Sequence, residues 1–411
     1  MSSKNFRDFV SLDHHRVVLT RGHDAHSYAE EIAKGPLARA FERENALYQQ
    51  PFVGITSDGN VIPNLYALQP NGAPTRPMFE ATGHLLELVS EQERAVLCYP
   101  IDAREWRRWN NGEMYLHKVG LRLEEVSVSI RNAIIGIVHA SLSAQGFEKV
   151  RDVMRLNAFL GDLVHAPRIL NEWSYNFSLF GTPSTVEPWG WNLFGHHLAL
   201  NCLVLGEQMV LSPTFLGAEP NFADTGPFAG TRLFQDEENI GLELMQSLSP
   251  TLQQQAVIYK QMKDPAMPPG RWHPGDQRHL GGMHQDNRII PYEGAHVAEF
   301  LASQRQCLLN LIAAYLTPLP SGPLSARMEE IERHLDETHF CWIGSYDDVH
   351  PFYYRIQSPV VMIEFDHHSG VFLANKEPEK FHVHTIVRTP NGNDYGIDLL
   401  RLHYEQSHSH Q

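Results

Sequence analysis

Two groups of segments with alternating polarity, one at 173–216 and one at 338–390, most constrain how this chain can fold. Each segment is short, rich in aromatic and aliphatic residues, and separated from the next by glycine or proline, which is typical of antiparallel strands. The first group ends in two runs that predict a hairpin turning at Gly206 and Glu207. The segments around both groups have helical periodicity. We therefore predict an α+β fold with antiparallel sheets flanked by helices.

The helical segments and the strand groups predict one large α+β domain at 46–404. Its helical part is expected at about 77–170, and further helices at about 235–335 lie between the two strand groups. Residues 1–45 are expected to form an N-terminal extension, and 405–411 a short tail. No stretch of linker composition divides the chain, which favours a single domain, or two halves that share an interface, over independent modules.

The composition favours a soluble protein with a small-molecule partner. The formal net charge is −15, and the basic residues are scattered, which argues against nucleic-acid binding. No run of apolar residues reaches membrane-spanning length, and the N-terminus has no signal-like apolar core, so we expect a cytoplasmic location and no membrane partner. The four cysteines show no paired spacing and are expected to be free thiols. Oligomeric state cannot be predicted from these features.

Two adjacent histidines, His196 and His197, interrupt the strand-like stretch WGWNLFGHHLALN. If the stretch is one continuous strand, His197 shares a face with Ala199 and Asn201, while His196 falls on the face of Leu198 and Leu200. The apolar face is expected to be core. His197 is thus the preferred cavity residue and His196 the alternative, because a bulge would exchange the two.

A second histidine pair, in the stretch FHVHTIVR, has the spacing of one strand face. The side chains of His382 and His384 start roughly 7 Å apart, so they can bind one ion. Glu364 ends the apolar run PVVMIEF, and a buried carboxylate needs a cation, a metal or several donors. We therefore predict a divalent transition-metal site (Fe, Cu, Mn, Zn or Ni) from the following set: His196, His197, Glu364, His382 and His384. Glu364 could instead pair with an arginine.

The chain carries a weak internal repeat. WGWNLFGHHLALNC can be aligned with FYYRIQSPVVMIEF, with aromatic and aliphatic residues at matching positions. In this register His197 matches Val360 and Asn201 matches Glu364. Two related halves are then expected, each directing a polar side chain into a shared interior lined by histidine and glutamate. Asn201 is accordingly a candidate catalytic residue.

Arginines are the candidates for holding an anionic substrate group. Arg388 falls on the strand face of His382 and His384. Its guanidinium could bind a substrate carboxylate in a bidentate manner. The alternative is a structural pair with Asp394. Arg355 is a weaker candidate, because strict alternation turns it away from Glu364 unless Pro359 breaks the register. The remaining residues expected to contact the substrate are Trp189, Trp191 and Asp394.

Two further stretches bear on the site. The glycine- and proline-rich connection at 263–294 is too long for an ordinary loop and is expected to be functional or to form a lid. The sequence DHH at 366–368, and HSH near the C-terminus, are expected to be exposed. No nucleotide-binding, zincin or serine-hydrolase motif is present.

Several long motifs resemble one known family. PWGWNLFGHHLALN, FYYRIQSPVVMIEFD and HVHTIVRTPNGNDYGIDLLRLHY are similar to motifs of the family called domain of unknown function 3500. The resemblance extends from about Phe52 to Tyr404. It implies no established activity. The chain departs from the family pattern at Val387 and Thr389, where tryptophan and aspartate are common, and at Thr385, where serine is usual.

These observations favour a metal-dependent enzyme that acts on a small organic substrate, expected to carry a carboxylate, with oxidation or oxygenation preferred. A zinc-type hydrolase or lyase is the first alternative. The second is a non-catalytic protein that binds a small molecule through the histidines, and the third is a structural role for the histidines and Glu364. Metal content distinguishes the two enzyme interpretations from the other two.

Overall fold

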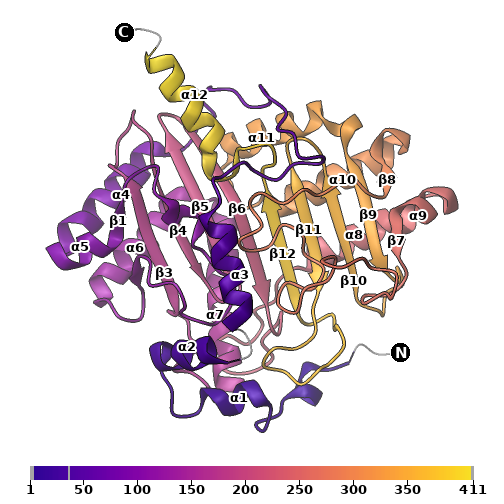
Figure 1. The fold of residues 1–411 in the computed structure, drawn as a ribbon, viewed down its shortest axis with the longest axis horizontal. Coiled ribbons are helices and arrows are strands. Elements are labelled where there is room, and N and C mark those ends of the chain that lie inside the picture. Colours follow the sequence, from indigo (N-terminus) through magenta and orange to yellow (C-terminus); the bar gives the residue numbers. More distant parts are fainter. Residues whose placement is uncertain (1–3, 36–37, 409–411) are drawn as a thin grey trace.

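The computed structural model describes residues 4–35 and 38–408. One sheet runs through the whole molecule (Figure 1), and its strands follow the order β1-β3-β4-β5-β6-β12-β11-β10-β9-β7. β2 pairs with β3 and β8 pairs with β9 at the two ends. Most neighbouring strands are antiparallel, and the helices lie outside the sheet. The predicted α+β class is therefore confirmed.

The first half of the chain forms one side of the sheet. Its helices and strands are α4 (Thr75–Leu88), α5 (Glu91–Leu97), β1 (Cys98–Tyr99), β2 (Leu121–Arg122), α6 (Val128–Ser141), α7 (Ala144–Leu163), β3 (Tyr175–Gly181), β4 (Trp189–Gly195), β5 (Leu198–Leu205) and β6 (Gln208–Ala218). Serine caps start three of the helices: Ser90, Ser127 and Ser143 each accept a backbone N–H of the first turn. The hairpin between β5 and β6 turns at Gly206 and Glu207, as predicted.

The second half repeats this series of elements in the same order. They are α8 (Gln235–Ser247), α9 (Pro250–Ala256), β7 (Val257–Tyr259), β8 (Ala295–His296), α10 (Ala302–Tyr315), α11 (Ser321–Arg333), β9 (His339–Gly344), β10 (Phe352–Gln357), β11 (Met362–His367) and β12 (Val383–Arg388). β1 runs parallel to β3, and β7 runs parallel to β9. The halves meet where β6 pairs antiparallel with β12. The internal repeat in the sequence thus corresponds to two related halves.

The aligned stretches are hairpins rather than single strands. WGWNLFGHHLALNC forms β4, a turn and β5, and FYYRIQSPVVMIEF forms β10, a turn and β11. His196 and His197 make the first turn, and His197 has a left-handed backbone with φ 62°. The expected strand alternation around these histidines is therefore wrong. Pro359 lies in the second turn, so Arg355 pairs directly opposite Glu364 and shares its face.

The remaining helices lie at the two ends of the chain: α1 (His15–Thr20), α2 (Ala25–Lys34), α3 (Ala38–Gln49) and α12 (Ile397–His408). Phe6, Val17 and Tyr28 are buried in the main core, so the N-terminal segment packs on the domain. α12 ends at His408, within the segment expected to be a tail. The end of the C-terminal HSH lies outside the described residues.

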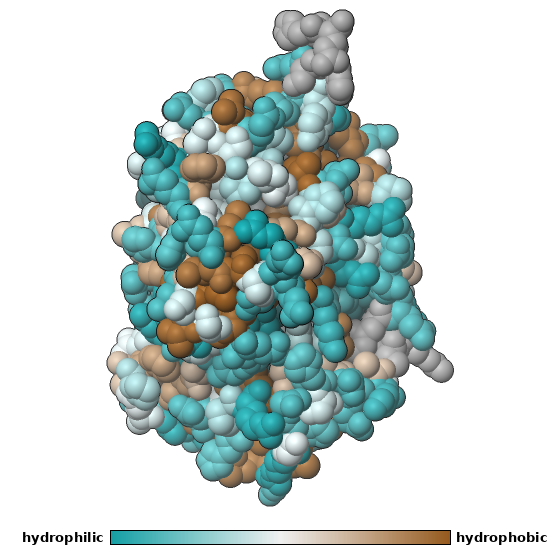
Figure 2. All heavy atoms as spheres, turned by 90° about the vertical axis from the view of Figure 1, so that its left-hand side faces the viewer, coloured by the Kyte–Doolittle hydropathy of each residue, from teal (hydrophilic) through white to brown (hydrophobic). Residues whose placement is uncertain are grey.

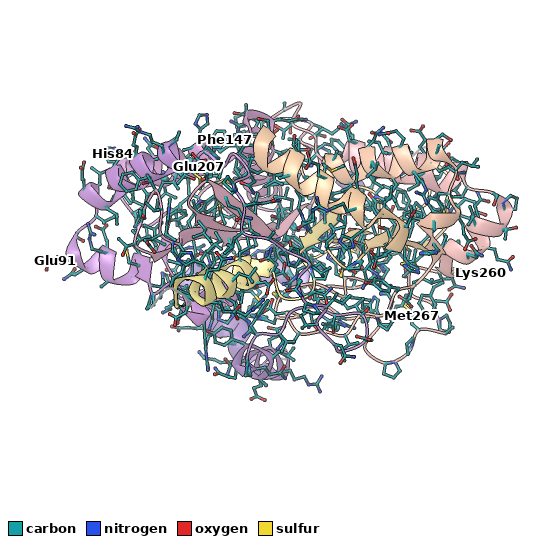
Figure 3. The ribbon with its side chains drawn as sticks, turned by 90° about the horizontal axis from the view of Figure 1, so that it is seen from above. His84, Glu91, Phe147, Glu207, Lys260 and Met267 are labelled. Carbon is teal, nitrogen blue, oxygen red and sulfur yellow. The ribbon has the colours of Figure 1, made fainter. Side chains whose placement is uncertain are left out.

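The two faces of the sheet are covered differently. In the edge-on view of Figure 3, α4 (at His84) and α7 (at Phe147) lie on one side, and the coil around Met267 lies on the other. This coil, residues 260–294, contains no helix or strand and is called the cover here. The helix-side core is mainly aromatic and aliphatic, whereas a network of buried charges that includes Arg278, Glu364 and Arg388 lies on the cover side. The predicted functional connection is therefore packed over one sheet face.

The surface formed by α4, α5 and α6 is partly apolar. Figure 2 faces this end of the molecule and shows hydrophobic side chains gathered near its centre. Exposed apolar residues on these helices are Phe79, Leu88, Val96 and Val128. In residues 4–35 and 38–408, no helix has the length and apolar character needed to cross a membrane.

Candidate metal centre

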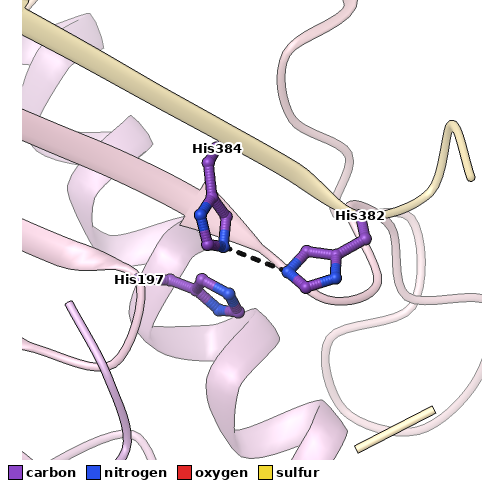
Figure 4. Close-up of side chains that lie close together, drawn as sticks. All are labelled: His197, His382 and His384. Atoms are coloured by element: carbon purple, nitrogen blue, oxygen red, sulfur yellow. Dashed lines mark hydrogen bonds between the residues drawn. The ribbon is translucent and has the colours of Figure 1, made fainter. Parts of the chain in front are cut away.

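Three of the five predicted ligands meet at one end of the central strands. His197, His382 and His384 each offer a ring nitrogen, and these nitrogens lie within 4.8 Å of one another. Figure 4 shows the three rings facing a common point, His197 from the β4–β5 turn and the other two from the start of β12. We call this group the His triad. All three side chains are buried.

The geometry of the His triad suits a metal ion. His382 Nε2 and His384 Nε2 lie 3.1 Å apart, close to the ~3.3 Å expected for two nitrogens bound to one tetrahedral ion at 2.0–2.1 Å. His382 Nδ1 lies 2.9 Å from the carbonyl oxygen of Ser369. A neutral ring donates its Nδ1–H there, which leaves the Nε2 lone pair directed at the triad.

Burial keeps the triad imidazoles neutral. Desolvation and, to a smaller extent, the neighbouring His196 lower the pKa of His382 to about 3. The pKa values of His197 and His384 are held well below the usual range by desolvation and by the other imidazoles. Neutral imidazole is the form that binds metals. The group therefore provides three ligand nitrogens without proton competition at neutral pH.

The backbone around His197 explains why this ring reaches the triad. Its N–H donates to the Asn111 carbonyl and its carbonyl accepts from Gly217 N–H, at 3.0 and 2.8 Å. A Cβ on Gly217 would lie 2.8 Å from the Val383 carbonyl oxygen, 3.0 Å from His197 Cδ2 and 3.1 Å from His384 Cδ2. Only a residue without a side chain leaves both rings undisturbed at this position.

His196 supports the triad and is not part of it. Its Nδ1 lies 2.8 Å from Asn157 Oδ1, and its ring stacks on His197 with centroids 3.9 Å apart. Asn157 uses its Nδ2 as a donor to Asn171 and Ser174, so its Oδ1 accepts from His196. Of the two adjacent histidines, the structure thus places the preferred one, His197, in the ligand group.

Glu364 also lies outside the ligand group. Its carboxylate accepts backbone N–H groups of Leu280 and Gly281, each at 2.8 Å, and the hydroxyl of Tyr353 at 2.6 Å. A buried carboxylate is thus satisfied by several donors, and two of them belong to the cover. The prediction that a carboxylate completes the metal site is corrected by this geometry. Glu364 instead binds the cover to β11.

The guanidinium of Arg388 is engaged with protein groups and is not free to bind a substrate in this arrangement. Its guanidinium donates to the carbonyls of Gly281 and Gly282 and to the carboxylates of Asp286 and Asp394. The structural pair with Asp394, the alternative raised from the sequence, is therefore present. Arg388 ties the cover to β12. Asp394 also has protein partners on both oxygens, because its other oxygen accepts from the Ser212 hydroxyl and from Thr389 N–H.

The other predicted site residues lie apart from the triad. Trp189 and Trp191 are fully buried in the helix-side core, and Trp191 donates to Ser141 of α6; their contact with a substrate stays a prediction. Arg355 donates to Pro291 and Glu293 near the edge of the cover. Asn201 is buried and donates to the Pro213 carbonyl, while its Oδ1 lacks a partner among the described residues.

The sequence interpretation missed the residues next to the triad. Asp366, His367 and His368 were expected to be exposed, but all three are buried. Asp366 pairs directly with His384 across β11 and β12, and the His368 ring lies tilted against His384 with centroids 3.7 Å apart. Asp366 also accepts from Arg278 of the cover at 2.5 Å. The alternation in VMIEFDH, which places Glu364 and Asp366 on one face, was a signal for this.

Comparison with known proteins identifies a family and no characterised relative. A family model described as a protein of unknown function (DUF3500) matches residues 71–397. No curated protein and no solved structure matches the chain. The match includes all strands of both halves, the cover and the three histidines of the triad.

Proposed function

Because the chain belongs to the DUF3500 family, whose function is unknown, we propose from the site alone that the protein is a metal-dependent enzyme acting on a small organic molecule. In this proposal His197, His382 and His384 bind one divalent transition-metal ion. The observation that carries it is the convergence of three buried, neutral imidazoles, with two Nε2 atoms 3.1 Å apart. Three protein ligands leave at least one coordination position for substrate or water.

Oxidation or oxygenation is the reaction class we place first, with iron, copper or manganese as the ion. All three ligands are buried under protein, and an enclosed site limits side reactions of reactive intermediates with water. A zinc-type hydrolase or lyase is the second candidate. Three histidines without a carboxylate ligand are a known zinc arrangement, and Glu364 is occupied elsewhere.

The first experiment measures metal content. The purified protein, and the protein after reconstitution with Mn, Fe, Zn, Ni or Cu, should contain one equivalent of metal and should melt at a higher temperature than the metal-free form. His382→Ala should abolish both effects. His350→Ala is the matched control, because the His350 side chain is 65% exposed and pairs with the nearby Asp347 on the surface. A wild-type protein that binds no transition metal under any of these conditions refutes the proposal.

A second experiment separates the reaction classes. An ion with absorption in the visible range or a paramagnetic resonance signal, together with activity that stops when oxygen is removed, supports oxidation. Tightly bound zinc and activity that is independent of oxygen support hydrolysis or elimination. A non-catalytic binding protein would retain its ligand affinity in the His382→Ala variant.

A further inference from the structure

Two more histidines lie beside the triad on the cover side of the sheet. The His368 ring lies against His384 with centroids 3.7 Å apart and the ring planes tilted by 32°, and the His279 ring lies 6.2 Å from His384 and 5.9 Å from His368. Both side chains are at most 2% exposed. Among the described residues, only the triad brings enough ligand atoms together to hold one ion, so His279 and His368 need another role.

The polar atoms around these two rings lack partners. Within the described residues, neither nitrogen of His279 forms a hydrogen bond, and neither does Nδ1 of His384. His368 Nε2 lies 2.9 Å from Asp366 Oδ2 but not in hydrogen-bond geometry. Asn111, whose carbonyl holds His197, has an unpartnered Oδ1. Buried polar groups are nearly always satisfied, so unpartnered ones in a group point to a bound molecule.

His279 is held in place although its ring is unpartnered. The preceding residue, Arg278, donates its backbone N–H and its Nε to Asp366. The following residue, Leu280, donates its N–H to Glu364. These contacts fix the backbone on both sides of His279 against β11. A side chain that is oriented in this way and has no protein partner is preorganised to bind a ligand.

We propose that His279 and His368 form a substrate subsite next to the triad that binds a neutral, hydroxyl-bearing group, such as part of a polyol or sugar. This inference rests on the proposed metal-dependent enzyme and names the chemical class of its substrate. The subsite forms when the cover lies over the sheet, because His279 belongs to the cover and His368 follows β11.

Hydroxyl groups match the chemistry of these side chains. A neutral imidazole has one donor and one acceptor nitrogen, and a hydroxyl both donates and accepts. A diol can therefore satisfy several of the unpartnered atoms together, whereas an apolar group would leave them all unsatisfied.

A carboxylate fits this subsite less well. The buried carboxyl group of Asp366 lies against His368, and that of Asp276 lies within electrostatic range of His279. The nearby guanidinium of Arg278 is already bound to Asp366 and to the His367 carbonyl. These two carboxyl groups disfavour a further negative charge beside His279 and His368. A carboxylate would need to reach either the proposed metal ion or the Arg271 guanidinium, which donates to the Arg278 carbonyl and has two nitrogens without a partner among the described residues. We therefore expect this subsite to prefer a hydroxyl-bearing group to a carboxylate.

The test is ligand binding by metal-reconstituted protein, measured by calorimetry with glycerol, xylitol and glucose against malonate and succinate. Wild-type protein should bind at least one of the three polyhydroxy compounds and should prefer it to both dicarboxylates. His279→Ala should weaken this binding by about tenfold or more, because it removes two hydrogen bonds. His279→Gln, which keeps a donor and an acceptor, should recover part of the affinity. Metal content should not change in either variant.

His84→Ala is the control, since His84 is exposed on α4 at the far end of the molecule (Figure 3). The inference is overturned if no polyhydroxy compound binds, if the dicarboxylates bind more tightly, or if His279→Ala binds as the wild type does. Two equivalents of metal in the wild type, one of them lost in His279→Ala, overturn it in favour of a second metal site. If His279-dependent polyol binding occurs in protein that takes up no metal, the proposed function fails while the subsite stands.

Discussion

Replacing Arg388 by methionine should destabilise the protein strongly, because it removes one of the two cations of a buried charge network. The guanidinium lies 2.8 Å from Asp286 Oδ1 and 3.1 Å from Asp394 Oδ2, and none of the three side chains is more than 1% exposed. It also donates to two carbonyls of the cover. Methionine has a similar length, so the main effect is the loss of charge and hydrogen bonds.

The size of the stability loss depends on the hydrogen bonds and ion pairs that Asp286 and Asp394 retain in the variant. Asp286 retains Arg107 and the Tyr395 hydroxyl, and Asp394 retains Ser212 and the Thr389 N–H. Removing one partner of a buried pair costs about 3–5 kcal/mol, and these remaining contacts favour the lower half of that range. The unfolding entropy of a chain of this length is roughly 0.9 kcal/mol/K. The melting temperature should therefore fall by about 3–5 °C.

Chemical denaturation and thermal melting of metal-reconstituted protein measure this effect. Arg401→Met is the control: Arg401 pairs with Asp398 and Glu405 on the exposed face of α12, and the change should stay within about 0.5 kcal/mol. The double variant Arg388→Met/Asp394→Asn should be more stable than the sum of its single changes predicts, since it removes a carboxylate that has lost its cation. An Arg388→Met protein with unchanged stability but weakened substrate binding would refute the structural assignment and restore the substrate role.

Three further predictions concern the triad, pH and the cover. Gly217→Ala should lower metal affinity, measured by chelator competition, because its Cβ would press on His197 and His384; an unchanged affinity would mean that the rings can move apart. The buried His284 has a pKa lowered to about 4, so its contribution to stability falls as the pH drops below the unfolded value of ~6.5. When the pH is lowered from 6.5 to 5, the free energy of unfolding, measured by denaturant titration, should therefore fall by ~2 kcal/mol less in His284→Gln than in the wild type. Equal falls in the two proteins would contradict this prediction. Glu364→Gln should retain bound metal but should increase proteolysis within 260–294. The change weakens the charge-assisted contact of Glu364 with the backbone N–H groups of Leu280 and Gly281, which is worth about 1.5–3 kcal/mol. Loss of metal in this variant would instead return Glu364 to the ligand set.

The local pattern of the sequence was sufficient to predict the strands and helices and to detect the internal repeat. Alternating apolar residues bounded by glycine and proline predicted the strands, because a strand that is buried on one face or both must carry this pattern. The aligned stretches correctly indicated two related halves. The prediction that each aligned stretch is one continuous strand was wrong in both cases. The two-residue turn at His196 and His197 has no glycine, and the left-handed conformation of His197 depends on contacts with Asn111 and Gly217.

The membership of the site was decided by tertiary structure. The sequence alone identified His382 and His384, whose spacing places two side chains on one strand face whatever surrounds them. It could not assign Glu364 or Arg388, because the partners of a buried charge come from wherever the chain packs, and here they come from the cover about a hundred residues away in sequence. Nor could it place His279, which approaches the triad only when residues 260–294 fold over β11 and β12, or His368, which reaches the triad because β11 pairs with β12. Strand spacing is a local property of the backbone, whereas the satisfaction of buried polar groups is a property of the whole packed molecule.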